Sequence, residues 1–168
     1  MRYKKVSNTI KVGAFLLISI LVFHGNTVFS QAPGTTYYWV GDGGDWTDVS
    51  HWSISSGGAS ASTVPGQDDA VVFDENSFSL ANQEVTINDD GSFYSMDWSG
   101  IADEQVLIFD STLYAYGDIT LNKMLSLRRN VNFSGIQFVQ QSVFDADSAS
   151  IDCAFQIIMD NTSDSLIF

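Results

Sequence analysis

After residue 30, the chain consists of short apolar or alternating runs divided by glycine, asparagine, aspartate and serine. Helical periodicity is almost absent there, whereas alternation of apolar and polar positions is typical of half-buried strands. Residues 112–121 (TLYAYGDITL) show the alternation best. Their apolar side chains of one parity are Leu113, Ala115, Ile119 and Leu121. This parity predicts one face of a pleated sheet turned toward a core.

The pattern predicts a ladder of short strands, with turn-forming pairs such as Ser99-Gly100 between them. We expect the strands at Thr36–Val40, Asp69–Phe73, Gln83–Ile87, Tyr94–Trp98, Val106–Phe109, Thr112–Tyr116, Asp118–Leu121, Met124–Leu127, Val131–Phe133, Ile136–Val139, Ser142–Phe144, Ser150–Ile151, Gln156–Met159 and Ser165–Phe168.

Rung-like triplets with apolar first and last residues recur along this ladder and begin at Val85, Val106, Val131 and Ile157. Their interval of about 20 to 25 residues suits one coil of a parallel β-solenoid. We therefore predict an all-β fold, a right-handed parallel β-helix, with a β-sandwich as the alternative.

The first 30 residues have the layout of a secretory signal peptide. Four basic residues precede an apolar run of 12 residues, Val12–Phe23. As a helix this run would span about 18 Å, short of the roughly 30 Å of a bilayer core. Small side chains at Val28 and Ser30 predict cleavage after Ser30, with an uncleaved anchor as the alternative. We expect an exported protein, secreted or on the cell surface, with no membrane span after cleavage.

Removal of this segment makes the chain strongly acidic. The mature 138 residues keep only Lys123, Arg128 and Arg129 against 20 acidic residues, a formal charge of −17. Such a surface repels nucleic acid and anionic lipid, so we expect neither as a partner. The single cysteine, Cys153, allows no internal disulfide, and the fold must depend on packing.

The mature chain divides by composition into two parts. Residues 31–67 are rich in glycine, serine and tryptophan, and we predict that they cap the N-terminal end of the solenoid, whose open edge would otherwise template aggregation. Residues 68–168 are predicted to form the rungs. The sequence stops on an apolar strand without a polar terminal cap, so we expect it to be the N-terminal piece of a longer polypeptide.

A distinctive tryptophan and glycine pattern runs through residues 38–74: YWVG, GGDW, HW, PG and DDAVVFD in that order. It resembles the opening of large β-helical surface proteins of Gram-negative bacteria. The segments VTI (85–87) and MDWSG (96–100) resemble their first rung, whereas His51 departs from the asparagine usual in that family. The resemblance implies a secreted, adhesin-like protein associated with type IX secretion.

Trp39, Trp46 and Trp52 are the candidate carbohydrate-binding residues, because an aromatic ring can stack on the C–H face of a sugar. The alternative, which we favour, is that they bury their rings in a core or cap while each indole N–H reaches a turn carbonyl.

Asp42, Asp45 and Asp48 are the candidate metal ligands, because calcium takes six to eight oxygen ligands, carboxylates among them. Their spacing does not match an EF-hand, which places acids at alternate positions and ends on a glutamate. Calcium is the one candidate cofactor, and the alternative is that these residues form a plain glycine-rich turn.

No catalytic residue is picked out by the sequence. It lacks the nucleophile-elbow, HExxH, phosphate-loop and zinc patterns. We expect the non-catalytic N-terminal portion of an exported cell-surface or secreted adhesin-like structural protein that contacts a glycan or another cell-surface ligand. The alternative is a β-helical lyase or hydrolase fragment acting on polysaccharide, which a pair of carboxylates lining a groove would favour.

Overall fold

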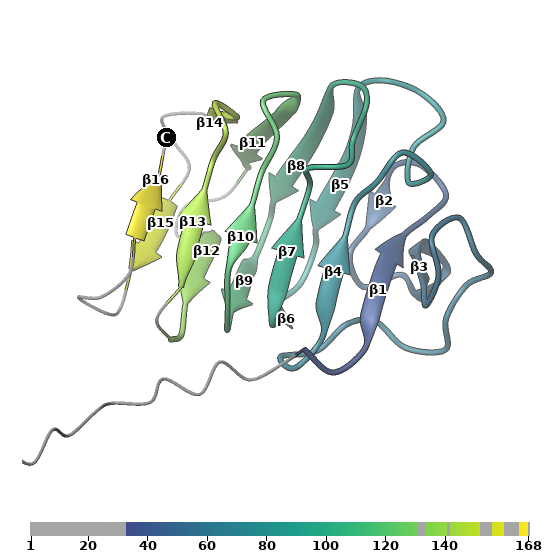
Figure 1. The fold of residues 1–168 in the computed structure, drawn as a ribbon, viewed down its shortest axis with the longest axis horizontal. Coiled ribbons are helices and arrows are strands. Elements are labelled where there is room, and N and C mark those ends of the chain that lie inside the picture. Colours follow the sequence, from purple (N-terminus) through teal and green to yellow (C-terminus); the bar gives the residue numbers. More distant parts are fainter. Residues whose placement is uncertain (1–32, 131–133, 141, 152–155, 160–164, 168) are drawn as a thin grey trace, which may run out of the picture. The chain divides into compact units, whose positions relative to one another are not determined.

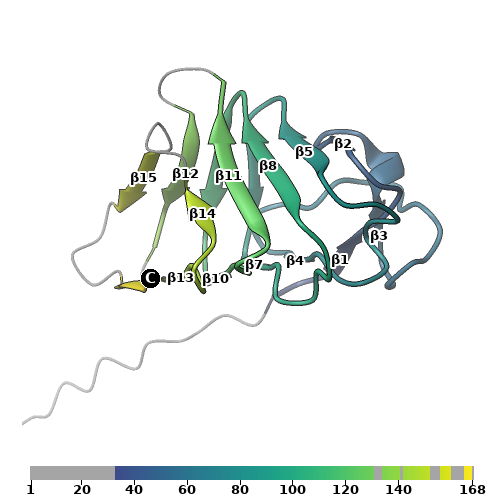
Figure 2. The ribbon, with the colours of Figure 1, turned by 90° about the horizontal axis from the view of Figure 1, so that it is seen from above.

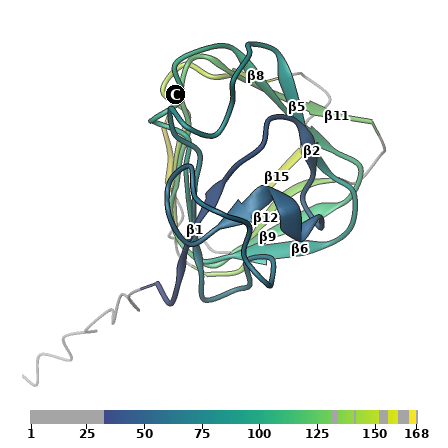
Figure 3. The ribbon, with the colours of Figure 1, turned by 90° about the vertical axis from the view of Figure 1, so that its right-hand side faces the viewer.

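A computed structural model describes residues 33–130, 134–140, 142–151, 156–159 and 165–167 of the chain. They wind into a β-solenoid walled by three sheets (Figure 1). Viewed from its β1 end, the coil runs clockwise as it recedes, so it is right-handed (Figure 3). The predicted all-β parallel β-helix is confirmed, and the alternative sandwich is not adopted. The predicted signal peptide, the predicted strand Val131–Phe133 and Cys153 lie outside the described residues.

The three sheets contain strands from successive coils. Sheet A has seven strands, in spatial order β16 (Ser165–Ile167), β13 (Val143–Asp145), β10 (Ile119–Thr120), β7 (Ser95–Asp97), β4 (Ala70–Val72), β1 (Thr36–Trp39) and β3 (Trp52–Ser53). Sheet B has five strands, β14 (Ser150–Ile151), β11 (Leu125–Arg129), β8 (Gln105–Phe109), β5 (Gln83–Ile87) and β2 (Gly44–Asp45), which lie side by side in Figure 2. Sheet C has four strands, β15 (Gln156–Met159), β12 (Gly135–Phe138), β9 (Thr112–Ala115) and β6 (Gly91–Phe93).

All strand pairs are parallel except one at the start of the coil. There β3 pairs antiparallel with the outer side of β1, and a short 3₁₀ helix, Val49–His51, leads into it. This antiparallel strand covers the first edge of sheet A, as the predicted N-terminal cap should. The segment 31–67 is more than a cap, however. Its strands β1 and β2 pair in parallel with β4 and β5, so the first coil already begins inside it.

Equivalent positions of successive coils stack in register. In sheet B, Val85 lies opposite Leu107, and Leu107 lies opposite Leu127. Because side chains alternate across a strand, register keeps each inward position directly above the inward position of the next coil. The four residues predicted to share a face, Leu113, Ala115, Ile119 and Leu121, are all buried.

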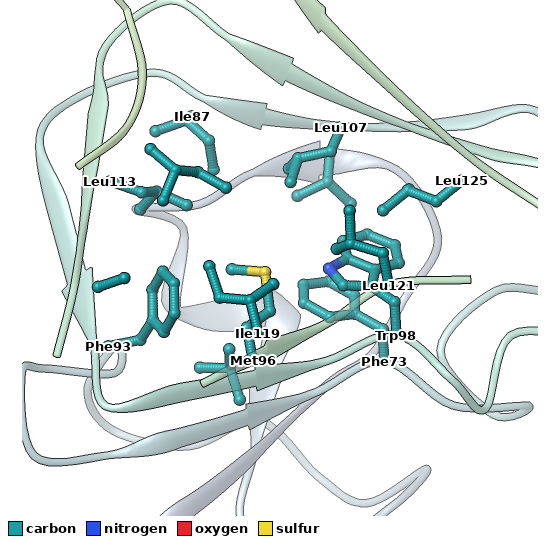
Figure 4. Packing of buried hydrophobic residues seen from close by; sticks show 14 of the residues in the cluster. Phe73, Ile87, Phe93, Met96, Trp98, Leu107, Leu113, Ile119, Leu121 and Leu125 are labelled. Carbon is teal, nitrogen blue, oxygen red and sulfur yellow. The ribbon is translucent and has the colours of Figure 1, made fainter. Parts of the chain in front are cut away.

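Inward side chains from all three sheets fill the coil (Figure 4). Met96 and Ile119 face inward from sheet A, Leu107 from sheet B, and Phe93 and Leu113 from sheet C. Side chains this well packed each make many dispersion contacts, which is how a chain without a disulfide is held together. The core is therefore one continuous column of apolar side chains along the coil.

Aspartate and asparagine make the turn that follows sheet A in four successive coils. The side-chain Oδ1 accepts a hydrogen bond from the backbone N–H two residues later, the geometry of an Asx turn. The acceptors are Asp74, Asp97, Asn122 and Asp145. Each lies directly before or after a buried residue that follows its strand, namely Phe73, Trp98, Leu121 or Ala146, so the turn begins where the buried face ends.

The predicted series of equivalent triplets is wrong, beginning with its first pair, because Val85 lies opposite Leu107 and not opposite Val106. Val85 and Val106 do begin segments of neighbouring sheet B strands, but the strand that pairs with β8 there is β11, which contains Leu125 and Leu127. The triplet at Ile157 belongs to β15 in sheet C. All three sheets repeat at similar intervals, so an interval alone does not tell which wall a triplet joins.

Truncation of a core leucine measures this packing. We expect Leu107→Ala, at a site with no exposed surface, to lower the free energy of unfolding by about 2–5 kcal/mol, because a cavity remains. The matched control is Leu80→Ala, whose side chain is 64% exposed and whose truncation should change stability by less than about 0.5 kcal/mol. Urea unfolding of the mature chain measures both, and equal effects would contradict the assigned inward face.

Candidate functional site

The predicted carbohydrate-binding tryptophans gather at the start of the coil. Trp39 comes from β1, Trp46 from the turn after β2, and Trp52 from β3. Trp52 meets both of the others edge-to-face, with ring centroids 5.0 Å from Trp39 and 4.7 Å from Trp46. Phe73 joins this group to the next coil by stacking on Trp98 at 3.6 Å. The result is an aromatic cluster that closes the column of core side chains.

Two glycines and one histidine allow the chain to pack closely against this cluster. Gly41 has a φ of 84°, in the left-handed region that favours glycine. A Cβ at Gly44 would lie 2.1 Å from the His51 ring. That ring stacks on Trp39 with centroids 4.8 Å apart, and its Nδ1 lies 2.9 Å from the Val40 carbonyl oxygen. His51 is thus a packing residue.

The indole N–H groups differ in how they are satisfied. Trp39 Nε1 donates to the Asp42 carbonyl at 2.6 Å, and Trp52 Nε1 donates to the Trp46 carbonyl at 2.8 Å, as the cap interpretation predicts. The indole nitrogens of Trp46 and Trp98 are buried without a hydrogen-bond partner. Trp39, Trp46 and Trp52 are at most 1% exposed. A sugar can stack only on an exposed ring, so none of these three indole faces is open to one.

The three candidate calcium ligands have other partners or stand apart. The Asp42 carboxylate accepts hydrogen bonds from the backbone N–H and hydroxyl of Ser79. Asp48 caps the 3₁₀ helix and accepts from the Ser50 backbone N–H at 2.9 Å, whereas Asp45 is exposed in β2. Within the described ranges, no group of three His, Cys, Asp or Glu side chains is arranged to hold a metal ion. The structure does not assemble these aspartates into a calcium site.

Hydrogen bonds from Ser50 hold the pKa of the Asp48 carboxyl below its usual value of 3.8. The bond from the Ser50 hydroxyl has the larger effect, and the bond from its backbone N–H adds to it. A lowered pKa in the folded state means that the ionised carboxylate stabilises the fold. That contribution is present above the ordinary carboxyl pKa and is lost as the pH falls through the lowered one.

Other aspartates tie neighbouring coils together. Asp69 accepts from the backbone N–H of Thr35 at 2.9 Å, and Asp118 accepts from that of Val143 at 2.7 Å. Asp90 accepts from the Thr112 backbone N–H at 3.1 Å and from the Ser111 hydroxyl. A good part of the acidic composition is therefore structural, because carboxylates satisfy backbone donors that the corners leave outside the sheets.

A cavity of about 340 Å³ lies beside the first strand of sheet C. Its walls come from segments far apart in the sequence: Trp46, Thr47, Val64, Pro65, Asp90, Gly91, Ser92, Tyr114 and Tyr116. We call it the tyrosine cavity. Sequence reasoning missed it, although the alternation that placed Leu113 and Ala115 inward also turned Tyr114 and Tyr116 outward. That parity was the only available signal.

A second cavity, of about 420 Å³, lies beside the cap. It is lined by Tyr37, Ile54, Ser55 and residues 59–63, which are alanine, serine and threonine. The Tyr37 hydroxyl shares a hydrogen bond with Thr63 at 2.8 Å. Its lining is small and uncharged, so it offers no group for acid–base chemistry.

No protein-family model, no curated protein and no solved structure matches this chain. Among the residues that the structure describes, no helix is long and apolar enough to cross a membrane.

The Asx turns can be tested at Asp97, which accepts from the Ser99 backbone N–H at 2.8 Å. We expect Asp97→Ala to lower the free energy of unfolding by about 1 kcal/mol, because that donor loses its acceptor. Asp97→Asn keeps an acceptor oxygen and should cost less than half as much. The control is Asp103→Ala, at an exposed acid outside these turns. Urea denaturation that gives Asp97→Ala and Asp103→Ala the same stability would contradict the structural role.

Proposed function

We propose that the chain is a non-catalytic, adhesin-like scaffold of an exported protein and contacts a glycan or another cell-surface ligand. The observation that carries the proposal is the regular parallel coil. Its sheets turn every second side chain outward, so it presents long lateral faces that repeat from coil to coil. Such faces suit contact with extended partners.

The distribution of carboxylates supports this function over polysaccharide cleavage. Hydrolysis of a glycosidic bond needs two carboxyl groups on opposite sides of the bond, one of them a proton donor. Of the two cavities described above, the tyrosine cavity has one lining carboxylate, Asp90, and the second cavity has none. The acids engaged in Asx turns and coil-to-coil contacts already have structural partners.

Export remains part of the proposal and follows from the sequence. The basic and apolar N-terminus has the layout of a signal peptide, and the mature charge of −17 favours a well-solvated surface. The tryptophan and glycine pattern supports the adhesin-like assignment through its resemblance to β-helical surface proteins.

The full chain with a C-terminal tag, expressed in a Gram-negative host, tests this function. We expect exported material beginning at Gln31 that binds saturably to immobilised cells or glycans. The same material unfolded in urea and diluted into the assay serves as the control for charge and stickiness.

Polysaccharide incubated with the exported protein should release no new reducing ends or unsaturated products. Such release would contradict the non-catalytic function. Retention of the protein in the cytoplasm, or binding no stronger than that of the unfolded control, would contradict the adhesive one.

A further inference from the structure

We propose that the tyrosine cavity is a binding site for a neutral saccharide. This inference rests on the proposed adhesive function and gives it a location and a ligand class. It moves the carbohydrate site from the buried tryptophans to outward-facing tyrosines of sheet C.

The sheet itself creates the cavity. β6 is the edge strand of sheet C, so no further strand covers that side of it. Ser92 on β6 lies opposite Tyr114 on β9, and both residues line the cavity. Tyr116 lies two residues further along on the same outward face and is, like Tyr114, half-buried. Two rings held by a rigid sheet therefore border one hollow.

The floor of the cavity is closely packed. A Cβ at Gly91 would lie 2.9 Å from both Trp46 Nε1 and Leu113 Cδ2, so this position has no space for a side chain. Trp46 is held in turn by its edge-to-face contact with Trp52. The cavity is thus built on the aromatic cluster, and its shape is set before any ligand arrives.

Polar groups in the lining match the hydroxyls of a sugar. The hydrogen bonds of the Asp90 carboxylate to Ser111 and Thr112 both use Oδ1, which leaves Oδ2 to accept from a ligand. Tyr114 and Tyr116 line the same hollow, and a phenolic hydroxyl can both donate and accept a hydrogen bond. Val64 and Pro65 add apolar surface to the lining. Aromatic faces with a few placed polar groups are the general makeup of a small-ligand site.

Charge decides which saccharides fit. The lining contains one acid and no basic residue, and the mature chain carries −17. An acidic sugar would meet like charge without a compensating cation, so the ligand class is neutral. A volume of about 340 Å³ is at the lower end for ligand pockets, which fits a short segment of a glycan.

The test uses isothermal titration of the exported protein with neutral oligosaccharides of gluco, manno and galacto type. Oligogalacturonate and a polyproline peptide are the competing probes, since aromatic grooves also bind proline-rich segments. We expect at least one neutral probe to bind and both competitors to fail.

Substitutions then locate the site. Tyr114→Ala and Tyr116→Ala should each weaken binding about tenfold or more through loss of ring contact. Asp90→Asn keeps the Oδ1 acceptor and should weaken binding about tenfold through loss of a charged acceptor. The matched control is Tyr38→Ala, at a half-buried outward tyrosine of sheet A, which should bind as the unsubstituted protein does. Thermal melting checks that every variant folds.

Three outcomes overturn the inference: no neutral probe binds, a competitor binds instead, or folded Tyr114→Ala and Tyr116→Ala variants bind normally. The same variants in the cell-adhesion assay separate this failure from that of the proposed function. If both variants still adhere to cells, the proposed scaffold function holds and its contact surface lies outside the tyrosine cavity. Absence of adhesion by the unsubstituted protein would defeat the proposed function itself.

Discussion

The aromatic ring of Phe73 links the N-terminal cap to the repeating coil, and it stacks on Trp98 of the next coil with ring centroids 3.6 Å apart. Phe73 also stacks on Trp39 at 5.7 Å, so one inward column of sheet A begins with three aromatic rings in successive coils. Below them the column continues with Leu121 and Ala146, which need less space. A parallel coil gains stability only when neighbours stack, and its first coil has a neighbour on one side only. The large rings supply the missing buried surface there.

The polar side of the structure follows from the same geometry. Each coil must turn between sheets, and each turn leaves backbone N–H groups outside the sheet hydrogen bonds. Aspartates accept many of these hydrogen bonds, both within a turn at Asp97 and between coils at Asp118. Part of the acidic composition therefore has a structural role at the corners of the coil. At Asp48, where hydrogen bonds lower the carboxyl pKa, this support is lost when acid protonates the group.

The sequence was informative wherever a property is local. Alternation identified the inward residues of segment 112–121, and the predicted strand Gln83–Ile87 has the same bounds as β5. The short strands β2, β3 and β6 were missed. Gly44 in β2 and Gly91 in β6 are typical turn residues, and they become strand residues only by pairing with the next coil. β3 likewise becomes a strand only by pairing with β1. The sequence left a sugar-binding and a packing role open for the tryptophans, and only their burial shows that no ring face is open. The tyrosine cavity brings together four distant segments, and no spacing in one sequence shows that.

The tryptophans form the packed beginning of the coil and are not its binding surface. Collisional quenching of tryptophan fluorescence by acrylamide in the folded mature chain tests this claim most directly. All four indoles are at most 1% exposed, so quenching should be far weaker than in the same chain unfolded in urea. Quenching equally strong in the folded and unfolded chains would contradict the claim.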